Sequence, residues 1–559
     1  NNFTEKDGSN LGEFFDKLFD VLNSKNRKNI PHYFSKFPYV NGSIFKNRVK
    51  LPNFTKKTRD LIVGNASLDW HIINPDILGS MLQSVVSPEE RDEEEMHYTS
   101  VPNILNVIGP LFLDNLETKI EEASDDEKAL KKILKYIYNI KIFDPACGSG
   151  NFLIITYKQL CTLEINIFRY LLKLSPDDWK MSVSGISLNQ FYGIEKSHYA
   201  AETAKLSLWL AEHQMNLDFK EVFGISKPSL PISELGNIVC ENSIKYCWEK
   251  FCNLENKTEE IFVIGNPPFK GYRARTEEQK KDVEYYFHGK NSKVDYVGLW
   301  FFKGADYISK LKKVKLAFVA TNSVNQGEQV NLIWPKIFDQ NIRIIFANKS
   351  FRWKNSARNN ATVTVSIIGL SNQDSRLNKY LIQDDKKISV KHLNGYLLDS
   401  RNIIVKNSSS SIFGLPKMSY GSMANDNGYL VLDIKDKEKL LSENANSKKF
   451  IKPFKGGIDF IRGVKRWCLW IEDKDLPEAS SVNFIKDRLE KVRNYRLKKK
   501  NQKWANLSHK FVEDRHKEQD AIFVPTTSSE RREYLPIGFY EKGTVITAPN
   551  QVIYNPSMY

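Results

Sequence analysis

The sequence lacks long apolar runs, paired cysteines and clustered histidines. No apolar segment reaches the ~18 residues that a membrane-spanning helix needs, so we expect no transmembrane helix. The first ten residues, NNFTEKDGSN, have neither the basic start nor the apolar core of a signal peptide. The six cysteines form no C-x-x-C pair and the nine histidines show no ligand spacing, which argues against a zinc site or a disulfide framework. These absences favour a reduced, cytoplasmic protein without a bound metal.

Charge and length are the first positive features. A chain of 559 residues predicts several domains, and a hydrophobic content of 41% excludes a disordered basic tail. Lys and Arg exceed Asp and Glu by 82 to 67, which favours a polyanionic partner such as nucleic acid. Residues 371–559 hold 34 basic and 23 acidic residues, whereas the rest hold 48 and 44. We therefore expect the C-terminal third to carry most of the basic surface.

The hydrophobic pattern divides the chain. Residues 11–95 have apolar positions at helical spacing, including the segment 68–86, and predict a helical domain over 1–95. From 96 to about 370 helical and strand patterns alternate, which predicts a mostly parallel sheet with helices on both faces, in a domain over 96–375. A linker over 376–413 contains the Ser-rich NSSSSIFG. Short strands and turns follow, and predict a further domain over 414–559.

The segment FDPACGSGNFL (143–153) reads as a strand ending in an acid, a small-residue loop and a helix. Gly148 and Gly150 allow close approach of a ligand to the backbone. The third glycine of the dinucleotide motif G-x-G-x-x-G is absent, and no Lys anchors a phosphate. The alternative is a tight β–α turn, but the residues around the glycines favour a loop that binds a cofactor without phosphates.

Glu195, in FYGIEKS (191–197), ends a second predicted strand. Ligands of open α/β sheets bind at the carboxyl ends of strands, and a carboxylate there can accept hydrogen bonds from both ribose hydroxyls. The interval from Gly150 is longer than the ~20 residues of a minimal dinucleotide unit, so an extended connection is expected. The alternative is a solvated Glu at the start of a helix.

A third strand ends in GNPPF (265–269). Two prolines remove backbone donors and stiffen the loop, which holds Asn266 in one place and leaves carbonyls free to accept. The Asn266 side-chain oxygen and the Pro267 carbonyl can therefore grip the two N–H groups of an exocyclic amine. Phe269 offers a flat face for a base that has been flipped out of a duplex. The alternative is a rigid turn with a core Phe.

These three motifs, in this order, resemble those of the S-adenosylmethionine-dependent DNA adenine N6-methyltransferases, in the arrangement of their gamma group. More narrowly, the chain is similar to the MmeI-like family of bifunctional type II restriction–modification enzymes (types IIG and IIL). The segments that carry the closer similarity span nearly the whole chain: FPYVNGSIF (37–45), HYTS (97–100), FDPACGSGNFLI (143–154), QFYGIEKS (190–197), SLWLAEHQMN (207–216), GNPPFKGY (265–272), TNSVNQGEQV (321–330), IRGVKRWCLW (461–470) and SSERREYLPIGF (528–539).

The similarity implies a Rossmann-like class I methyltransferase sheet between an N-terminal helical connector domain and a C-terminal α+β target-recognition domain, of which this chain holds a part. It implies S-adenosyl-L-methionine as cofactor and a catalytic group formed by Asn266, Pro267, Pro268 and Phe269. The implied cofactor-binding residues are Tyr98 and Thr99 at the methionine end, Asp144, Ala146, Gly148 and Gly150 along the loop, Glu195 at the ribose and Asn242 at the adenine ring. Phe351 or Trp353 would form the second wall around the flipped base.

Basic residues predict the DNA contacts. The segment KVRNYRLKKKNQKW (491–504) interleaves cations with aromatic residues, so Lys498, Lys499 and Lys500 are expected at phosphates. Lys270 and Arg273, with Arg275 nearby, flank the GNPPF loop and could hold the backbone of the flipped nucleotide. The alternative in each case is a solvated charged face.

The expected function is therefore site-specific transfer of a methyl group to adenine N6 in double-stranded DNA, by direct displacement and without a metal, in the bacterial cytoplasm. Three alternatives stay open: N4-cytosine methylation, methylation of a protein glutamine amide, and a DNA-binding specificity subunit with an inactive methylase fold. The family's P-D-(D/E)-x-K nuclease motif is not found, so we expect the cleavage domain to be absent from this chain, and the recognition domain to be cut at Tyr559. The sequence is compatible with a monomer.

Overall fold

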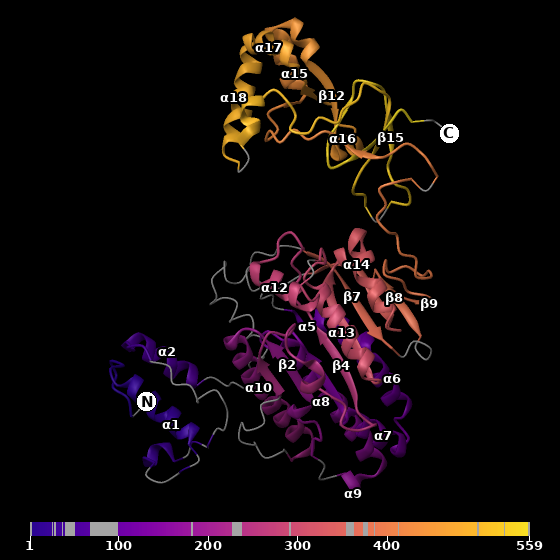
Figure 1. The fold of residues 1–559 in the computed structure, drawn as a ribbon. Helices are drawn as coiled ribbons and strands as arrows, with labels where there is room; N and C mark the ends of the chain where they lie inside the picture. The colour runs from indigo at the N-terminus through magenta and orange to yellow at the C-terminus, as the bar shows by residue number, and fades with distance from the viewer. Residues whose placement is uncertain are drawn as a thin grey trace. The chain divides into compact units, whose positions relative to one another are not determined.

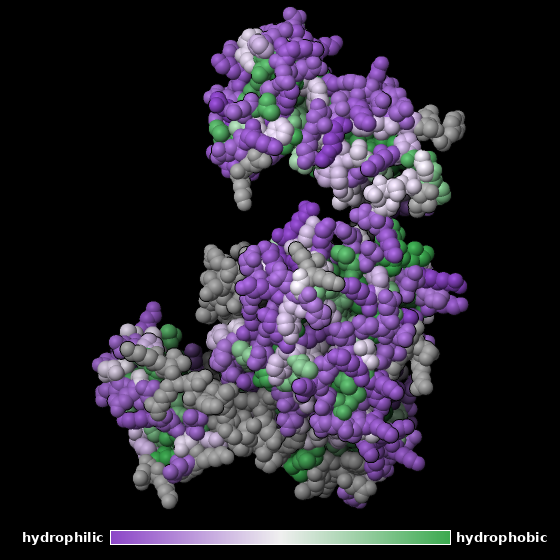
Figure 2. All heavy atoms as spheres, in the orientation of Figure 1, coloured by the Kyte–Doolittle hydropathy of each residue, from purple (hydrophilic) through white to green (hydrophobic). Residues whose placement is uncertain are grey.

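The computed structural model describes residues 3–24, 26, 30–35, 37, 39, 51–67, 99–179, 183–225, 237–289, 292–353, 363–372, 378–384, 386–411, 413–499, 502–529 and 532–556. Contacts divide the chain into two compact units, Asn1–Lys406 and Asn407–Tyr559. Within the described ranges no helix is long and apolar enough to cross a membrane, and hydrophilic residues cover most of the face drawn in Figure 2.

The N-terminal segment forms helices α1 (Leu11–Asn23) and α2 (Lys56–Ala66), with a short 3-10 turn at His32–Phe34. Thr55 caps α2: its side chain accepts from the Thr58 backbone N–H, and the Thr58 hydroxyl accepts from the Thr55 backbone N–H. The predicted helix at 68–86 lies outside the described residues, as do Tyr98 and Lys500.

A large twisted sheet organises the first unit (Figure 1). In the described residues its strand order is β3-β2-β1-β4-β5-β7-β6-β8-β9. The first five strands of that order are parallel, and β7 runs antiparallel to both of its neighbours. The strands are β1 (Ile140–Asp144), β2 (Phe191–Glu195), β3 (Asn237–Cys240), β4 (Glu260–Gly265), β5 (Val314–Thr321), β6 (Arg343–Trp353), β7 (Val363–Ser371), β8 (Lys379–Gln383) and β9 (Lys386–Val390).

Helices cover both faces of this sheet. Successive strand residues point to opposite faces, so Ile142 joins the core that contains α8, while Phe143 joins the core that contains α13. The helices are α5 (Val101–Ile108), α6 (Asp114–Glu122), α7 (Glu127–Ile137), α8 (Asn151–Leu174), α9 (Pro176–Trp179), α10 (His198–Phe223), α11 (Trp248–Phe251), α12 (Glu277–Tyr286), α13 (Gly298–Lys310) and α14 (Gly327–Phe338). The predicted α/β class, with a mostly parallel sheet, is confirmed.

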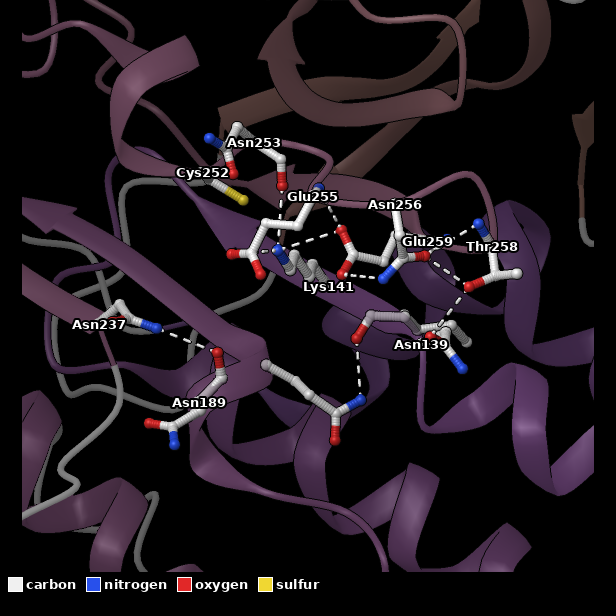
Figure 3. A network of polar contacts seen from close by, with 12 residues as sticks. Asn139, Lys141, Asn189, Asn237, Cys252, Asn253, Glu255, Asn256, Thr258 and Glu259 are labelled. Atoms are coloured by element: carbon white, nitrogen blue, oxygen red, sulfur yellow. Dashed lines mark hydrogen bonds and ion pairs between the residues drawn. The ribbon is translucent and has the colours of Figure 1, made fainter.

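A polar network closes the amino ends of the central strands (Figure 3). The buried Lys141 of β1 donates to the Asn253 carbonyl at 3.0 Å and forms ion pairs with Glu255 at 3.3 Å and Glu259 at 3.2 Å. These contacts bind the amino end of β1 to the loop before β4 and so hold the amino ends of these strands together. A ligand can bind at the opposite ends, the carboxyl ends of the parallel strands.

The second unit is a separate α+β structure. It contains the sheets β10-β17-β14-β15 and β11-β13-β12-β16, each with its own hydrophobic core. The strands are β10 (Ser419–Tyr420), β11 (Val431–Leu432), β12 (Ile451–Lys455), β13 (Arg466–Leu469), β14 (Ala521–Val524), β15 (Gly538–Tyr540), β16 (Val545–Ile546) and β17 (Gln551–Tyr554). The helices are α15 (Ile434–Glu443), α16 (Gly457–Arg462), α17 (Leu476–Ser481) and α18 (Asn483–Leu497).

Candidate functional site: a cavity at the carboxyl edge of the sheet

The glycine loop connects the end of β1 to the start of α8. Gly148 and Gly150 have φ values of +54° and +87°, a region that favours glycine. A Cβ on Gly150 would lie 3.1 Å from the Ala204 Cβ of α10, so this glycine also permits close packing of α10. The loop thus brings its backbone and the start of α8 to the carboxyl ends of the strands.

Asp144 lies beneath this loop and is 1% exposed. Its Oδ1 accepts a hydrogen bond from the Ala146 N–H at 3.0 Å. Burial, with a smaller contribution from the nearby Glu195, raises the pKa of Asp144 to about 8. A Cβ on Gly265 would lie 2.7 Å from Asp144 Oδ1, so the glycine before Asn266 is required by close approach to this acid.

Glu195 ends β2 and faces the glycine loop. Its Oε2 accepts from the Gly148 N–H at 2.9 Å, and its Oε1 accepts from the Ser197 N–H at 2.8 Å. These two backbone donors hold one carboxylate oxygen each. The carboxylate is therefore held in a fixed orientation on the cavity wall.

The GNPPF loop follows β4 and brings Asn266 to the same cavity. Asn266 Nδ2 donates to the Thr99 hydroxyl at 3.3 Å, and Thr99 itself is buried. Asn266 Oδ1 is buried and has no hydrogen-bond partner among the described residues. An unpaired buried acceptor is costly, so its presence beside a cavity points to a ligand that donates there. Phe269 is half-buried and packs against both cores of the sheet.

Beyond the end of β3, Asn242 contacts residues that the sequence reasoning missed. Its Nδ2 donates to the two carboxylate oxygens of Asp282, at 3.1 and 3.2 Å. The Tyr296 hydroxyl donates to the same carboxylate at 2.7 Å. Asp282 belongs to α12, whose sequence EEQKKDVEYY reads as a solvated charged helix, so no local pattern distinguishes this buried acid from its exposed neighbours.

These elements enclose a cavity of about 510 Å³. Its walls include seven of the residues predicted for the site: Thr99, Ala146, Gly148, Glu195, Asn242, Asn266 and Pro268. Five further predicted residues are not among its lining residues: Asp144, Gly150 and Pro267 lie in the same loops, Phe269 packs beside them, and Phe351 lies on β6. Residues Thr276 to Gln279 and Asp282, at and after the start of α12, also line it, as do Tyr296 and Trp300.

The predicted DNA-contacting residues are distributed over both units. Lys270 and Arg273 follow the GNPPF loop, and the Arg273 Nε donates to the Tyr272 hydroxyl at 2.7 Å. Arg275 is instead buried, where it donates to the carbonyls of Tyr272 and Ser292. Lys498 and Lys499 follow α18 and are exposed, and Lys499 Nζ lies 4.6 Å from the centre of the Tyr495 ring.

The class I methyltransferase fold is defined by this strand order, with a glycine loop after β1 and an acid at the end of β2. Comparisons with known proteins then identify the family of methyltransferases to which the chain belongs. Residues 120–383 match the family model described as "MmeI, DNA-methyltransferase domain", and residues 399–559 match "MmeI, target recognition domain". The chain belongs to the MmeI family, as the sequence motifs predicted.

Two relatives show how similar the chain is to known proteins. The chain is 43% identical to DNA methyltransferase A of Bacillus subtilis (strain 168) over 563 residues, which cover 100% of this chain and 64% of that protein. The solved structure of the type IIL restriction–modification enzyme MmeI in complex with DNA superposes with a TM-score of 0.85 at 34% identity, over 99% of this chain and 75% of that one. The chain therefore spans less than two thirds of the B. subtilis relative.

Proposed function

We propose that this protein transfers the methyl group of S-adenosyl-L-methionine to N6 of an adenine flipped out of double-stranded DNA. The observation that carries the proposal is the buried, unpaired Oδ1 of Asn266 at the edge of the cavity. A rigid acceptor in that place suits a substrate that donates N–H groups, and an exocyclic amine donates two. Membership of a DNA-methyltransferase family supports the choice of substrate.

The residues around the cavity fit the proposed cofactor. Glu195 is oriented to accept hydrogen bonds from ribose hydroxyls, and the Gly148 loop lets a ligand approach the backbone. Neither a lysine nor the third glycine of a dinucleotide loop is present, which suits a cofactor without phosphates. When bound, the cofactor supplies an electrophilic methyl group on a sulfonium.

The chain's own residues act by positioning. The Asn266 Oδ1 and the Pro267 carbonyl accept the two amine hydrogens, so the nitrogen lone pair is directed away from the purine ring. Phe269 provides an apolar face for the base. With the cofactor bound, this placement would direct the nitrogen at the methyl carbon, whose bonding pair to sulfur would stay on the departing thioether, and the amine proton would be lost to water. Orientation of two bound reactants supplies most of the acceleration, and no general base is needed.

Asn266→Ala tests this role. We expect methyl transfer to fall by at least about a hundredfold, because the variant cannot orient the amine. Binding of S-adenosylhomocysteine, measured by calorimetry, should change by less than about threefold, since the lost contact concerns the substrate. Transfer is measured with tritiated cofactor and a DNA that carries the recognition sequence. Turnover close to that of the wild type would remove Asn266 from the proposed mechanism.

Asn189→Ala is a matched control, because Asn189 is another asparagine of the same domain and lies at the amino edge of the sheet (Figure 3). It should leave transfer unchanged. The methylated DNA is then digested to nucleosides and separated. N6-methyl-2′-deoxyadenosine supports the proposal. N4-methyl-2′-deoxycytidine would show that cytosine is the substrate instead, and absence of any transfer would favour an inactive methylase fold.

The wider role is also a proposal. The target-recognition domain match over 399–559 and the similarity to an enzyme solved with DNA support binding of duplex DNA by the second unit. The same similarities support a role in restriction–modification. Single-molecule sequencing of DNA from cells that express the gene would report the modified base, the motif and the strand. Unmodified DNA would contradict both the activity and this role.

A further inference from the structure

The cavity extends along the carboxyl edge of the sheet. Asn266 follows β4, the glycine loop follows β1, Glu195 ends β2 and Asn242 follows β3. Since these strands are neighbours in the order β3-β2-β1-β4, a long ligand with its methyl group near Asn266 and its ribose at Glu195 places its purine beside Asn242. This step rests on the proposed function, because it assumes the proposed cofactor.

The orientation of the Asn242 amide is determined by its neighbours. The Ile244 N–H donates to Asn242 Oδ1 at 3.0 Å, and the Asp282 carboxylate accepts from Asn242 Nδ2. An N–H can only donate and an ionised carboxylate can only accept, so a flipped amide would lose both hydrogen bonds. Asn242 Oδ1 therefore keeps one lone pair available as an acceptor toward the cavity.

Asp282 lines the cavity and is held by three protein donors. It is 2% exposed, and it accepts hydrogen bonds from the Tyr296 hydroxyl and the Asn242 amide and pairs with the Lys245 ammonium at 3.1 Å. Its two oxygens are thereby occupied by protein donors. The effect of Asp282 on a ligand therefore runs through the orientation of Asn242.

We infer that Asp282 is a positioning residue that fixes the Asn242 amide as a hydrogen-bond acceptor, and so makes the cavity selective for a purine with a 6-amino group. An adenine donates an N–H at that position. A hypoxanthine presents a carbonyl oxygen there, which would face Asn242 Oδ1 with no proton between them. The selectivity is thus determined by an acid of α12 that orients the amide in contact with the purine.

The test compares the affinities of S-adenosylhomocysteine and S-inosylhomocysteine by calorimetry. The wild type should prefer the adenosyl compound by about tenfold or more, which corresponds to one unsatisfied buried acceptor. Asp282→Asn keeps the side-chain shape but supplies a donor, so only the Ile244 N–H still opposes a turn of the Asn242 amide that would bring Nδ2 toward the purine. The preference should then shrink by about tenfold, through weaker adenosyl and stronger inosyl binding.

Tyr296→Phe is the matched control. It removes a hydrogen bond from the same carboxylate but leaves the Asn242 contact, so the ratio of the two affinities should persist even if both affinities fall. If Asp282→Asn does not fold, Asp282→Ser serves the same comparison, because it also removes the carboxylate that orients the amide. A circular-dichroism melting curve reports folding of each variant.

An unchanged ratio in a folded Asp282 variant would overturn the inference while leaving the proposed cofactor intact. An equal loss of preference in Tyr296→Phe would also overturn it, because general loosening of the cavity would then explain both results. A wild type that binds neither compound would overturn the proposed cofactor, and the inference with it.

Discussion

At the scale of the residue, Asp144 shows how burial alters an acid. It is almost fully enclosed below the glycine loop, and its pKa of about 8 is due first to desolvation and then to the neighbouring Glu195. The ordinary aspartate value is 3.8, so between these two pH values the folded protein binds a proton that the unfolded chain has released. Stability from this group is therefore fully present at low pH and is lost as the pH rises through 8.

We predict that Asp144→Asn flattens this part of the pH dependence. Without ligand, the melting temperature of the wild type should fall between pH 5 and pH 8.5 more steeply than that of the variant, because only the wild type must release a buried proton. Thermal unfolding in buffers of constant ionic strength measures the difference. Parallel curves for the two proteins would contradict the raised pKa.

At the scale of the element, α18 combines two kinds of basic residue. Arg496 is 1% exposed and donates to five carbonyls, those of Asn425, Trp504, Leu507, Ala424 and Lys510. It therefore ties α18 to two other segments of the second unit. Arg493, three residues earlier, is exposed. The sequence KVRNYRLKKK cannot distinguish these roles, because both arginines sit among similar charges.

We predict that Arg496→Met destabilises the second unit by at least ~3 kcal/mol, since each buried carbonyl left without a donor costs roughly 1–3 kcal/mol. Arg493→Met, the matched control on the same helix, should change stability by less than about 0.5 kcal/mol. Hydrogen–deuterium exchange of peptides from residues 407–559 at increasing urea, read by mass spectrometry, reports on this unit. Equal midpoints for the two variants would contradict a structural role for Arg496.

The elements that the sequence predicted are those with a strong local pattern. The buried run IKIFD predicted β1, and NFLIITYKQLCTLEINIFRYLLKL predicted α8, because continuous or periodic apolar residues need no tertiary information. The loops after β1, β2 and β4 were recognisable because glycines, an acid or prolines directly follow an apolar strand pattern. The Asp282 contact was not, because it joins residues 40 positions apart and depends on how α12 packs over the cavity.

At the scale of the whole molecule, the net charge of +15 is unevenly divided. The first 370 residues, which contain the cavity, carry 48 basic and 44 acidic residues, whereas the remainder carries 34 and 23. The second unit, residues 407–559, carries 27 basic and 19 acidic residues, against 55 and 48 in the much longer first unit. Its higher net charge per residue fits a role in contacting the phosphate backbone. The exposed lysines after α18 are the densest part of that basic surface in the sequence.

We predict that replacing Lys498, Lys499 and Lys500 with Ser weakens DNA binding about equally for all sequences. If each lysine contacts one phosphate, the slope of log affinity against log salt should become shallower by about three, because each lost contact removes nearly one released counterion. Replacing Lys128, Lys132 and Lys135 on α7 removes the same charge from the first unit and should change the slope by less than the amount expected for one phosphate contact.

Fluorescence anisotropy with specific and non-specific duplexes at several salt concentrations measures both slopes. If the two triple variants have the same slope, the lysines after α18 contribute only general charge; if only the specific duplex is affected, they read sequence instead of backbone.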